Sequence, residues 1–254
     1  MNTNDNHLAW EKEHVEAWHQ RFGAPETYAL KIKKDPQHVL GSLNRVLTDV
    51  KDKDVLNIMG SNGNKAVALA LLGANVTVVD LSESNKDYAM ALAEAADVSI
   101  RYVISDVLAY DETNQYDIAF AEMGILHYFT DLAPFFKTLY EALRTSGQCM
   151  IRDFHPVSTK LITSRGSTAK VRKHKVDGDY FDTQLTQKIV SYGKYLNDQE
   201  PETVHLRNWT LGEIITAAAQ VGFRIETLIE EPNLSSDTYD KGIPKTFILK
   251  MSKS

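Results

Sequence analysis

Several acidic side chains and two histidines come just after short apolar runs in the middle of the chain. They are Asp80, Asp106, Glu122, His127 and His155. A carboxylate accepts hydrogen bonds from the hydroxyl or amino groups of a ligand. A histidine can take up a proton close to neutral pH. The chain therefore carries, at recurring positions, groups suited to bind a polar ligand and to remove a proton from it.

The apolar runs alternate with helical patterns, which indicates how these groups are positioned. Strands are predicted at Val55–Met59, Val76–Val79, Ile100–Ile104, Tyr116–Ala121, Gln148–Phe154, Phe223–Ile229 and Thr246–Met251. Helices are predicted at Lys65–Leu72 and Ser84–Ala96, from Asp131 to near Gly147, and from the capping box at Thr210 to Gly222. Strands that alternate with crossover helices form a parallel sheet covered on both faces.

The predicted fold is therefore α/β, with a doubly wound, Rossmann-like sheet of seven strands. The sheet is mostly parallel, and its last strand is antiparallel because no clear crossover helix separates the two final strands. Residues 1–50 are expected to form a helical cap. The polar segment 157–208 interrupts the alternation after strand five, and its stretch Lys175–Asp179 predicts a hairpin turn.

Composition excludes several classes of protein. A net charge of −6 over 254 residues argues against nucleic-acid binding by the chain as a whole. No apolar stretch reaches the roughly 20 residues of a membrane span. The only cysteine, Cys149, and a polar amino terminus favour a cytoplasmic location. The histidines have no paired metal-ligand spacing, so no metal site is predicted.

The segment Met59–Gly63 follows the first strand, which is where a doubly wound sheet binds its ligands. A dinucleotide loop of the form Gly-x-Gly-x-x-Gly would begin at Gly60. Its second and third glycines are replaced by Asn62 and Lys65, so the dinucleotide pattern fails. Asp80, twenty residues after Gly60, would suit a ribose in a dinucleotide or in another nucleoside ligand.

Residues 55–82 better resemble motifs I and II of the class I S-adenosylmethionine-dependent methyltransferases, commonly V-L-D-L-G-C-G-T-G. Asn57 stands where the family has its acid, and Met59 and Ser61 stand where it has its first two glycines. Gly60 takes the place of the cysteine, and Gly63 keeps the last glycine. The resemblance is to the small-molecule, bacterial-like type, because the segment WTLGEIITAAAQVGF near the carboxyl terminus recurs there.

The resemblance implies a set of cofactor contacts. Asp80 would accept hydrogen bonds from both ribose hydroxyls, and Asp106 would meet the adenine amino group. The loop after the first strand would hold the methionine end. The implied cofactor-binding residues are Gly60, Ser61, Asn62, Gly63, Asp80, Leu81, Asp106, Val107 and Glu122. The division of the single domain would be a cap at 1–50, a cofactor-binding core at 51–156, a lid at 157–208 and the rest of the sheet at 209–254.

The implied activity is transfer of a methyl group from S-adenosylmethionine to a small-molecule acceptor by in-line displacement, with S-adenosylhomocysteine as the product. The acceptor atom stays open among oxygen, nitrogen, sulfur and carbon, as does the oligomeric state. Two alternatives remain from the sequence: a nicotinamide-dependent oxidoreductase, and a protein that binds S-adenosylmethionine without catalysis.

Where the acceptor must lose a proton, His155 is the predicted general base, since it follows strand five and Pro156 fixes the chain behind it. Replacing it with alanine would then slow the reaction by about two to four orders of magnitude. His127 is the second candidate. Tyr28, Tyr128 and His155 are predicted to contact the acceptor, whereas Trp18 is expected to pack on the flank of the sheet.

Overall fold

The sheet contains the seven predicted strands. The computed structural model describes residues 14–47, 49–164, 174–189, 203–232 and 242–254. The strands of the main sheet are β1 (Asp54–Ile58), β2 (Asn75–Asp80), β3 (Arg101–Ile104), β4 (Tyr116–Glu122), β5 (Leu143–Phe154), β10 (Phe223–Pro232) and β11 (Pro244–Lys253). Their order across the sheet is β10-β11-β5-β4-β1-β2-β3.

Strand direction follows the prediction. β1 is parallel to both β2 and β4, β2 is parallel to β3, and β4 is parallel to β5. β11 is antiparallel to β5 on one side and to β10 on the other. The predicted fold class is therefore confirmed. Strand order reverses between β1 and β4, so the carboxyl ends of these two strands border the crevice where ligands bind in such sheets.

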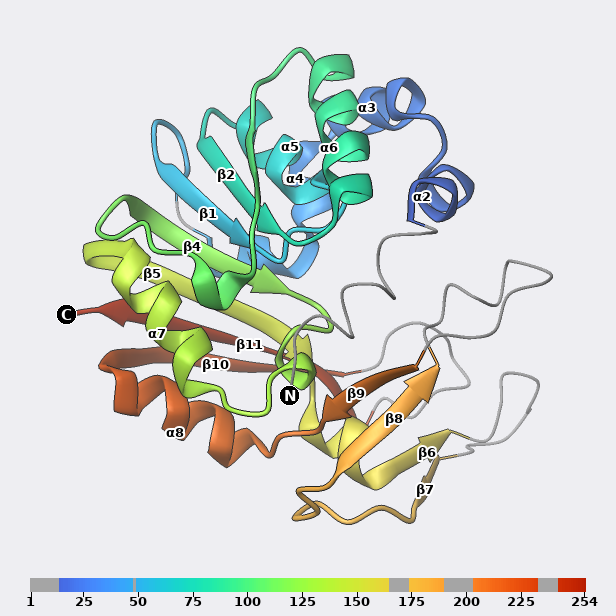
Figure 1. The fold of residues 1–254 in the computed structure, drawn as a ribbon, viewed down its shortest axis with the longest axis vertical. Coiled ribbons are helices and arrows are strands. Elements are labelled where there is room, and N and C mark those ends of the chain that lie inside the picture. Colours follow the sequence, from blue (N-terminus) through green and yellow to red (C-terminus); the bar gives the residue numbers. More distant parts are fainter. Residues whose placement is uncertain (1–13, 48, 165–173, 190–202, 233–241) are drawn as a thin grey trace.

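Helices cover both faces of the sheet (Figure 1). One layer holds α3 (Pro25–Lys34), α4 (Pro36–Leu40), α5 (Asn64–Leu71) and α6 (Glu83–Ala95), and the other holds α7 (Ala133–Ala142) and α8 (Leu211–Val221). Helix α2 (His14–Phe22) lies alongside α6. Single-turn helices η1 (Gly41–Arg45), η2 (Val107–Ala109), η3 (Leu126–Tyr128) and η4 (Val157–Leu161) fill the connections.

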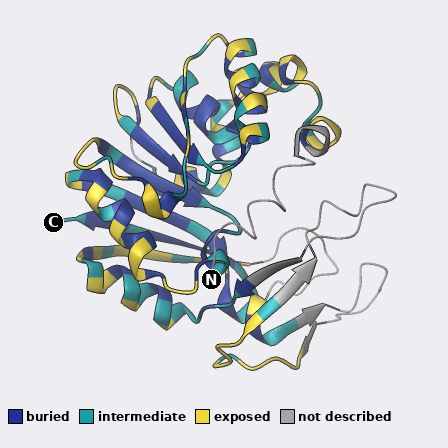
Figure 2. Cartoon of the chain, in the orientation of Figure 1, coloured by how far each residue is buried: buried dark blue, intermediate teal, exposed yellow. Residues whose placement is uncertain are grey.

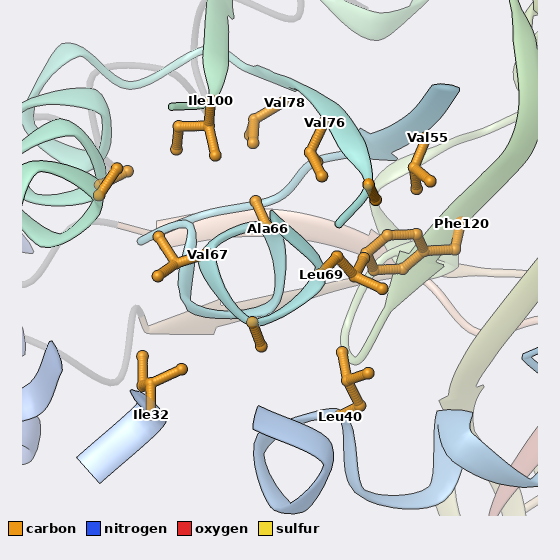
Figure 3. Packing of buried hydrophobic residues seen from close by; sticks show 14 of the residues in the cluster. Ile32, Leu40, Val55, Ala66, Val67, Leu69, Val76, Val78, Ile100 and Phe120 are labelled. Carbon is orange, nitrogen blue, oxygen red and sulfur yellow. The ribbon is translucent and has the colours of Figure 1, made fainter. Parts of the chain in front are cut away.

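Apolar burial fixes α5 on the sheet directly behind the first loop. The central strands are buried along their length, as Figure 2 shows by colour. Figure 3 shows Ala66 and Leu69 of α5 among Val55, Val76 and Phe120 of the strands. Each large apolar side chain buried in this way stabilises the fold by about 1.5–3 kcal/mol. The helix that follows the ligand loop is thus held rigidly, and the loop is held with it.

Two local predictions were wrong. Helix α7 ends at Ala142 rather than near Gly147, because Leu143 is already extended (φ −75°, ψ 144°) and begins β5. Lys175–Asp179 is not a hairpin turn, because β7 (His174–Val176) pairs with β6 (Ile162–Ser164), which precedes it. A second pair joins β8 (Leu185–Ile189) to β9 (Thr203–Arg207). Residues 1–13 of the predicted cap, and 165–173 and 190–202 of the predicted lid, lie outside the described residues.

Candidate functional site

A cavity of about 360 Å³ lies at the carboxyl ends of β1, β2 and β4. Its volume is within the range of small-molecule sites. The predicted cofactor residues that line it are Ser61, Asn62, Asp80, Leu81, Asp106, Val107 and Glu122, and Tyr128 lines it as well. The rest of the wall is Trp18, Arg21, Phe22, Met59, Asn64, Val79, Ser82, Asn85, Ser105, Met123, Gly124, Ile125 and Phe129. Residues from five separate parts of the chain thus meet at one place.

The loop after β1 has the backbone of a glycine-rich turn. Met59 and Ser61 both have φ near +50°, a region that costs ordinary residues about 1–2 kcal/mol. These are the two positions where the resembling family has glycine. Gly60 and Gly63 do not line the cavity but shape the loop. A Cβ on Gly60 would lie 2.6 Å from Val78 Cγ1, and one on Gly63 would lie 2.6 Å from Ala89 Cβ.

Asp80 and Tyr102 hold this loop in place. The Ser61 amide donates to Asp80 Oδ2 (2.9 Å), and the Tyr102 hydroxyl donates to the Ser61 carbonyl (2.7 Å). Asp80 Oδ1 accepts from the Ser82 amide (3.1 Å) and from Asn85 Nδ2 (3.3 Å). Burial raises the pKa of Asp80, while the amides of Ser82 and Ser61 act in the opposite direction. One carboxylate therefore ties the loop to the end of β2 and faces the cavity.

Replacing Ser61 with glycine is expected to stabilise the protein by about 1 kcal/mol, because glycine adopts positive φ without strain. The Ser61 backbone bonds would be kept. Urea unfolding measures the change as a higher midpoint at constant slope. Ser84→Gly, inside helix α6, is the matched control and should destabilise by about 0.5–1 kcal/mol. A loss of stability in Ser61→Gly would contradict the strain argument.

The end of β3 offers a second polar group to the cavity. Asp106 Oδ1 accepts the Leu108 amide (2.9 Å), which caps η2, and the carboxylate lies half-buried in the wall beside Val107. Leu81 lines the same cavity from the end of β2. An acceptor beside two apolar side chains suits a flat heteroaromatic base with an amino group.

Glu122, at the end of β4, is paired with two cations. Arg152 donates to its Oε1 (2.8 Å), and Lys65 Nζ lies 3.2 Å from its Oε2. Arg152 also donates to Glu231 (2.9 Å). Glu122 therefore lines the cavity, and its charge is compensated by Arg152 and Lys65, which do not line it. Asn57, at the position of the family's acid, is buried and does not line the cavity.

The loop after β4 forms the opposite wall, and sequence reasoning missed the residues that hold it. Asp153 is 3% exposed and accepts the amides of Gly124 (2.7 Å), Ile125 (3.0 Å) and Leu126 (2.8 Å). The Trp209 indole donates to the Leu126 carbonyl (3.0 Å) from the far side. The available signal was Asp153 itself. It is an aspartate at the end of a strand, and Arg152 is the only cation beside it in the sequence.

His155 does not lie in the cavity, and its assignment as general base and acceptor contact is corrected. The side chain is 2% exposed. Its Nδ1 accepts the Val157 amide (3.1 Å), so the neutral ring carries its proton on Nε2, which donates to Glu230 Oε1 (2.8 Å). Neither nitrogen is open to an acceptor. The strand-end position was predicted correctly, but the chain turns the ring towards β10.

His155→Gln is expected to flatten the dependence of stability on pH in mild acid. Burial lowers the pKa of His155, against the effect of Glu230. As pH falls below about 6.5, the unfolded chain takes up the proton first, so wild-type stability falls by at most about 1.4 kcal/mol per pH unit. Urea unfolding at pH 7.5 and 5.5 checks this. The affinity for the ligand should stay within about twofold of wild type. If His155→Gln abolished ligand binding, His155 would have a role in the cavity after all.

Three other predicted residues are also placed by the structure. His127 contacts Tyr128 with its ring tilted by 55° (centroids 4.4 Å apart) and lines a smaller pocket beside Pro156, so it is not in the main cavity. Tyr28 does not line the cavity; it packs on Phe22 (4.7 Å) and accepts a bond from Asn64. Trp18, expected on the flank of the sheet, does line it.

The described part of the chain lacks two features. None of its helices combines the length and apolar character that crossing a membrane requires. In the same residues, no group of three or more His, Cys, Asp or Glu side chains is arranged to hold a metal ion.

Comparison with known proteins assigns this architecture. Residues 55–147 match the family model described as a methyltransferase domain. A ubiquinone biosynthesis O-methyltransferase of Rickettsia bellii is 23% identical over 114 residues, which are 45% of this chain and 47% of that protein. The matched stretch thus spans about half the length of the curated relatives.

Solved structures share the fold over most of the chain. A Listeria monocytogenes protein assigned to the S-adenosylmethionine-dependent methyltransferases has a TM-score of 0.68 at 21% identity, covering 86% of this chain and 99% of that one. An S-adenosylmethionine-dependent methyltransferase of Mesorhizobium loti has a TM-score of 0.63 at 19% identity, covering 84% and 96%. The comparisons agree with the predicted resemblance: residues 55–147 match the methyltransferase-domain model, and the strand order is that of a fold shared with S-adenosylmethionine-dependent methyltransferases.

Proposed function

We propose that this protein transfers a methyl group from S-adenosylmethionine to a small-molecule acceptor. The observation that carries the proposal is the placement of Asp80, at the end of β2, beside the loop whose Met59 and Ser61 adopt the backbone of the family's glycines. The cavity next to them is large enough for a nucleoside with an amino-acid arm.

Each part of the cofactor has a matching wall. The ribose hydroxyls would donate to Asp80, and the adenine would lie between Leu81 and Val107, with its amino group at Asp106. The methionine end would lie against Ser61 and Asn62 of the loop. When bound, the cofactor supplies an electrophilic methyl group; the protein aligns it and excludes water.

The acceptor side of the cavity would be the loop after β4. Met123, Ile125, Tyr128 and Phe129 give it an apolar and aromatic surface. Among the described residues of the wall there is no histidine, cysteine or lysine. On this placement, the described groups contribute alignment and removal of water rather than proton abstraction, and Tyr128 is the polar contact for the acceptor.

Calorimetry with S-adenosylmethionine, S-adenosylhomocysteine and NAD tests the cofactor. We expect binding of the first two and none of NAD; the reverse would favour the nicotinamide alternative. Turnover is tested by release of S-adenosylhomocysteine with hydroxyl, amine and thiol compounds. Phenols come first in that panel, because the Rickettsia relative is an O-methyltransferase of ubiquinone biosynthesis. Cofactor binding without release across the panel would favour the non-catalytic alternative.

The proposal also concerns the partners of the protein and its location in the cell. A small-molecule acceptor is the only partner we assign, and the cytoplasmic location stays a prediction from the single cysteine. That cysteine, Cys149, is buried in β5, and burial raises the pKa of its thiol, so it is no candidate nucleophile.

A further inference from the structure

Helix α2 presents one cation to the cavity. Trp18, Arg21 and Phe22 are spaced at i, i+3 and i+4, so they share one face of the helix, and all three line the cavity. The other charged residues of the described wall are Asp80, Asp106 and Glu122, which are all acids. Arg21 is therefore the one basic side chain among the described lining residues.

Contacts of Trp18 and Phe22, which flank Arg21 in the sequence, fix the place of Arg21. The Trp18 indole donates to Asn85 Oδ1 (2.8 Å), and Asn85 in turn donates to Asp80. At the end of the helix Phe22 stacks on Tyr28, whose hydroxyl accepts a bond from Asn64 (3.3 Å). Asn85 and Asn64 themselves line the cavity. The helix is thus anchored to the cavity wall on either side of Arg21.

Arg21 has capacity to bind a ligand. Its side chain is exposed, and the guanidinium carbon lies 5.2 Å from the centre of the Phe22 ring. No carboxylate among the described residues forms an ion pair with it. A guanidinium offers a planar fork of N–H donors that matches a carboxylate with two parallel hydrogen bonds. A ligand carboxylate entering a wall of three acids would need such a group.

We propose that Arg21 is a carboxylate-binding residue of the cavity and that it holds the carboxylate at the methionine end of the cofactor. This inference rests on the proposed function. The position favours that source because the Phe22 end of α2 is tied to Asn64, which directly follows the loop Met59–Gly63. The ammonium and sulfonium groups of the cofactor match the acidic wall, and its carboxylate matches Arg21. An acidic acceptor is the other source of the same chemistry.

Two probes separate the cofactor carboxylate from the rest of the molecule. S-adenosylhomocysteine has the amino-acid arm, whereas 5′-deoxy-5′-methylthioadenosine keeps the adenosine and the sulfur but lacks it. In calorimetry, Arg21→Gln should weaken the binding of S-adenosylhomocysteine by about 10- to 100-fold, the range for one charged hydrogen-bonded contact. The affinity for 5′-deoxy-5′-methylthioadenosine should change by less than about twofold. Arg21→Lys should recover part of the loss, since it keeps the charge without the fork.

Arg224→Gln is the matched control, because it removes the same charge from an exposed residue of β10 whose partner is Glu226. This substitution should leave the affinity for both probes unchanged. If Arg21→Gln lowered the affinity for both probes equally, the cavity wall would be disturbed and the proposal would be overturned. An unchanged affinity for both probes would overturn it as well. Unchanged S-adenosylhomocysteine binding with turnover lost only for acceptors that carry a carboxylate would assign Arg21 to the acceptor and also overturn it. A wild-type protein that binds neither probe would instead refute the proposed function, and the subsite with it.

Discussion

Asp80→Asn is expected to weaken the binding of S-adenosylhomocysteine by at least about 100-fold. Two ribose hydroxyls would donate to a charged carboxylate, and each such bond contributes about 1.5–3 kcal/mol. The amide cannot replace the carboxylate in any orientation. Asp80 already accepts the Ser61 amide on one oxygen and the Ser82 amide on the other, so an NH₂ group would face one of these donors. Calorimetry measures the loss.

A comparison of ligands separates the lost ribose contact from a disturbed loop. Wild-type protein should prefer S-adenosylhomocysteine strongly over its 2′,3′-dideoxy analogue, and Asp80→Asn should show little preference. If the variant still discriminates between the two, Asp80 does not contact the ribose. Asp87→Asn, an exposed acid on the same helix as Asn85, makes the same charge change and should leave both affinities unaltered.

The pH dependence gives an independent check on the same residue. Burial raises the pKa of Asp80, so its carboxyl gains a proton at a higher pH than an ordinary aspartate. The protonated carboxyl is the poorer acceptor. Wild-type affinity should therefore fall as pH is lowered towards this raised pKa, whereas the affinity of Asp80→Asn should be flat across the same range.

The sequence predicted the sheet well because its signals are local. Apolar runs of the length of Val76–Val79 and stops such as Gly73 and Gly222 depend on neighbours in the chain. The common position of three cavity-lining residues was predicted for the same reason: Ser61, Asp80 and Asp106 lie within three residues of a strand end, and parallel strands bring those ends to one edge. Position along a strand was enough to place them.

The errors came from side chains whose surroundings are distant in sequence. His155 is bonded to Glu230, 75 residues away, and no local pattern indicates that pairing. Trp18 and Tyr28 were assigned the wrong way round, because helical spacing shows that a face is buried but not what covers it. Asn85 gave a usable signal: it is a polar residue on the buried face of α6, shared with Tyr88, Ala89 and Leu92. A buried amide needs partners, and here they are Trp18 and Asp80.

Asp153→Asn is expected to lower the free energy of unfolding by about 3–5 kcal/mol. The carboxylate accepts four backbone amides: Gly124 and Phe154 on Oδ1 at 2.7 Å each, and Ile125 and Leu126 on Oδ2. An asparagine would direct its NH₂ at two of these donors. Two charged hydrogen bonds would be lost inside the protein, at about 1.5–3 kcal/mol each, and the amides left behind could not reach water.

The same substitution should weaken the ligand site, because Gly124 and Ile125 line the cavity. Hydrogen exchange should show faster exchange at 123–128 than at the sheet, since the loop loses its internal acceptor while β4 keeps its ladder. Trp209→Phe would leave the Leu126 carbonyl without the indole bond and should produce the same loop response at a smaller cost, about 1 kcal/mol.

Asp131→Asn provides the comparison for an exposed carboxylate, which precedes helix α7 and is not its N-cap residue. It accepts one amide, that of Ala133, from an exposed position, so its loss should cost less than about 1 kcal/mol and leave the loop unaffected. If Asp153→Asn behaved like Asp131→Asn in urea unfolding, the four bonds would not be what holds the loop. The cavity wall would then depend on the apolar packing of Ile125 and Phe129 and on the Trp209 bond to the Leu126 carbonyl.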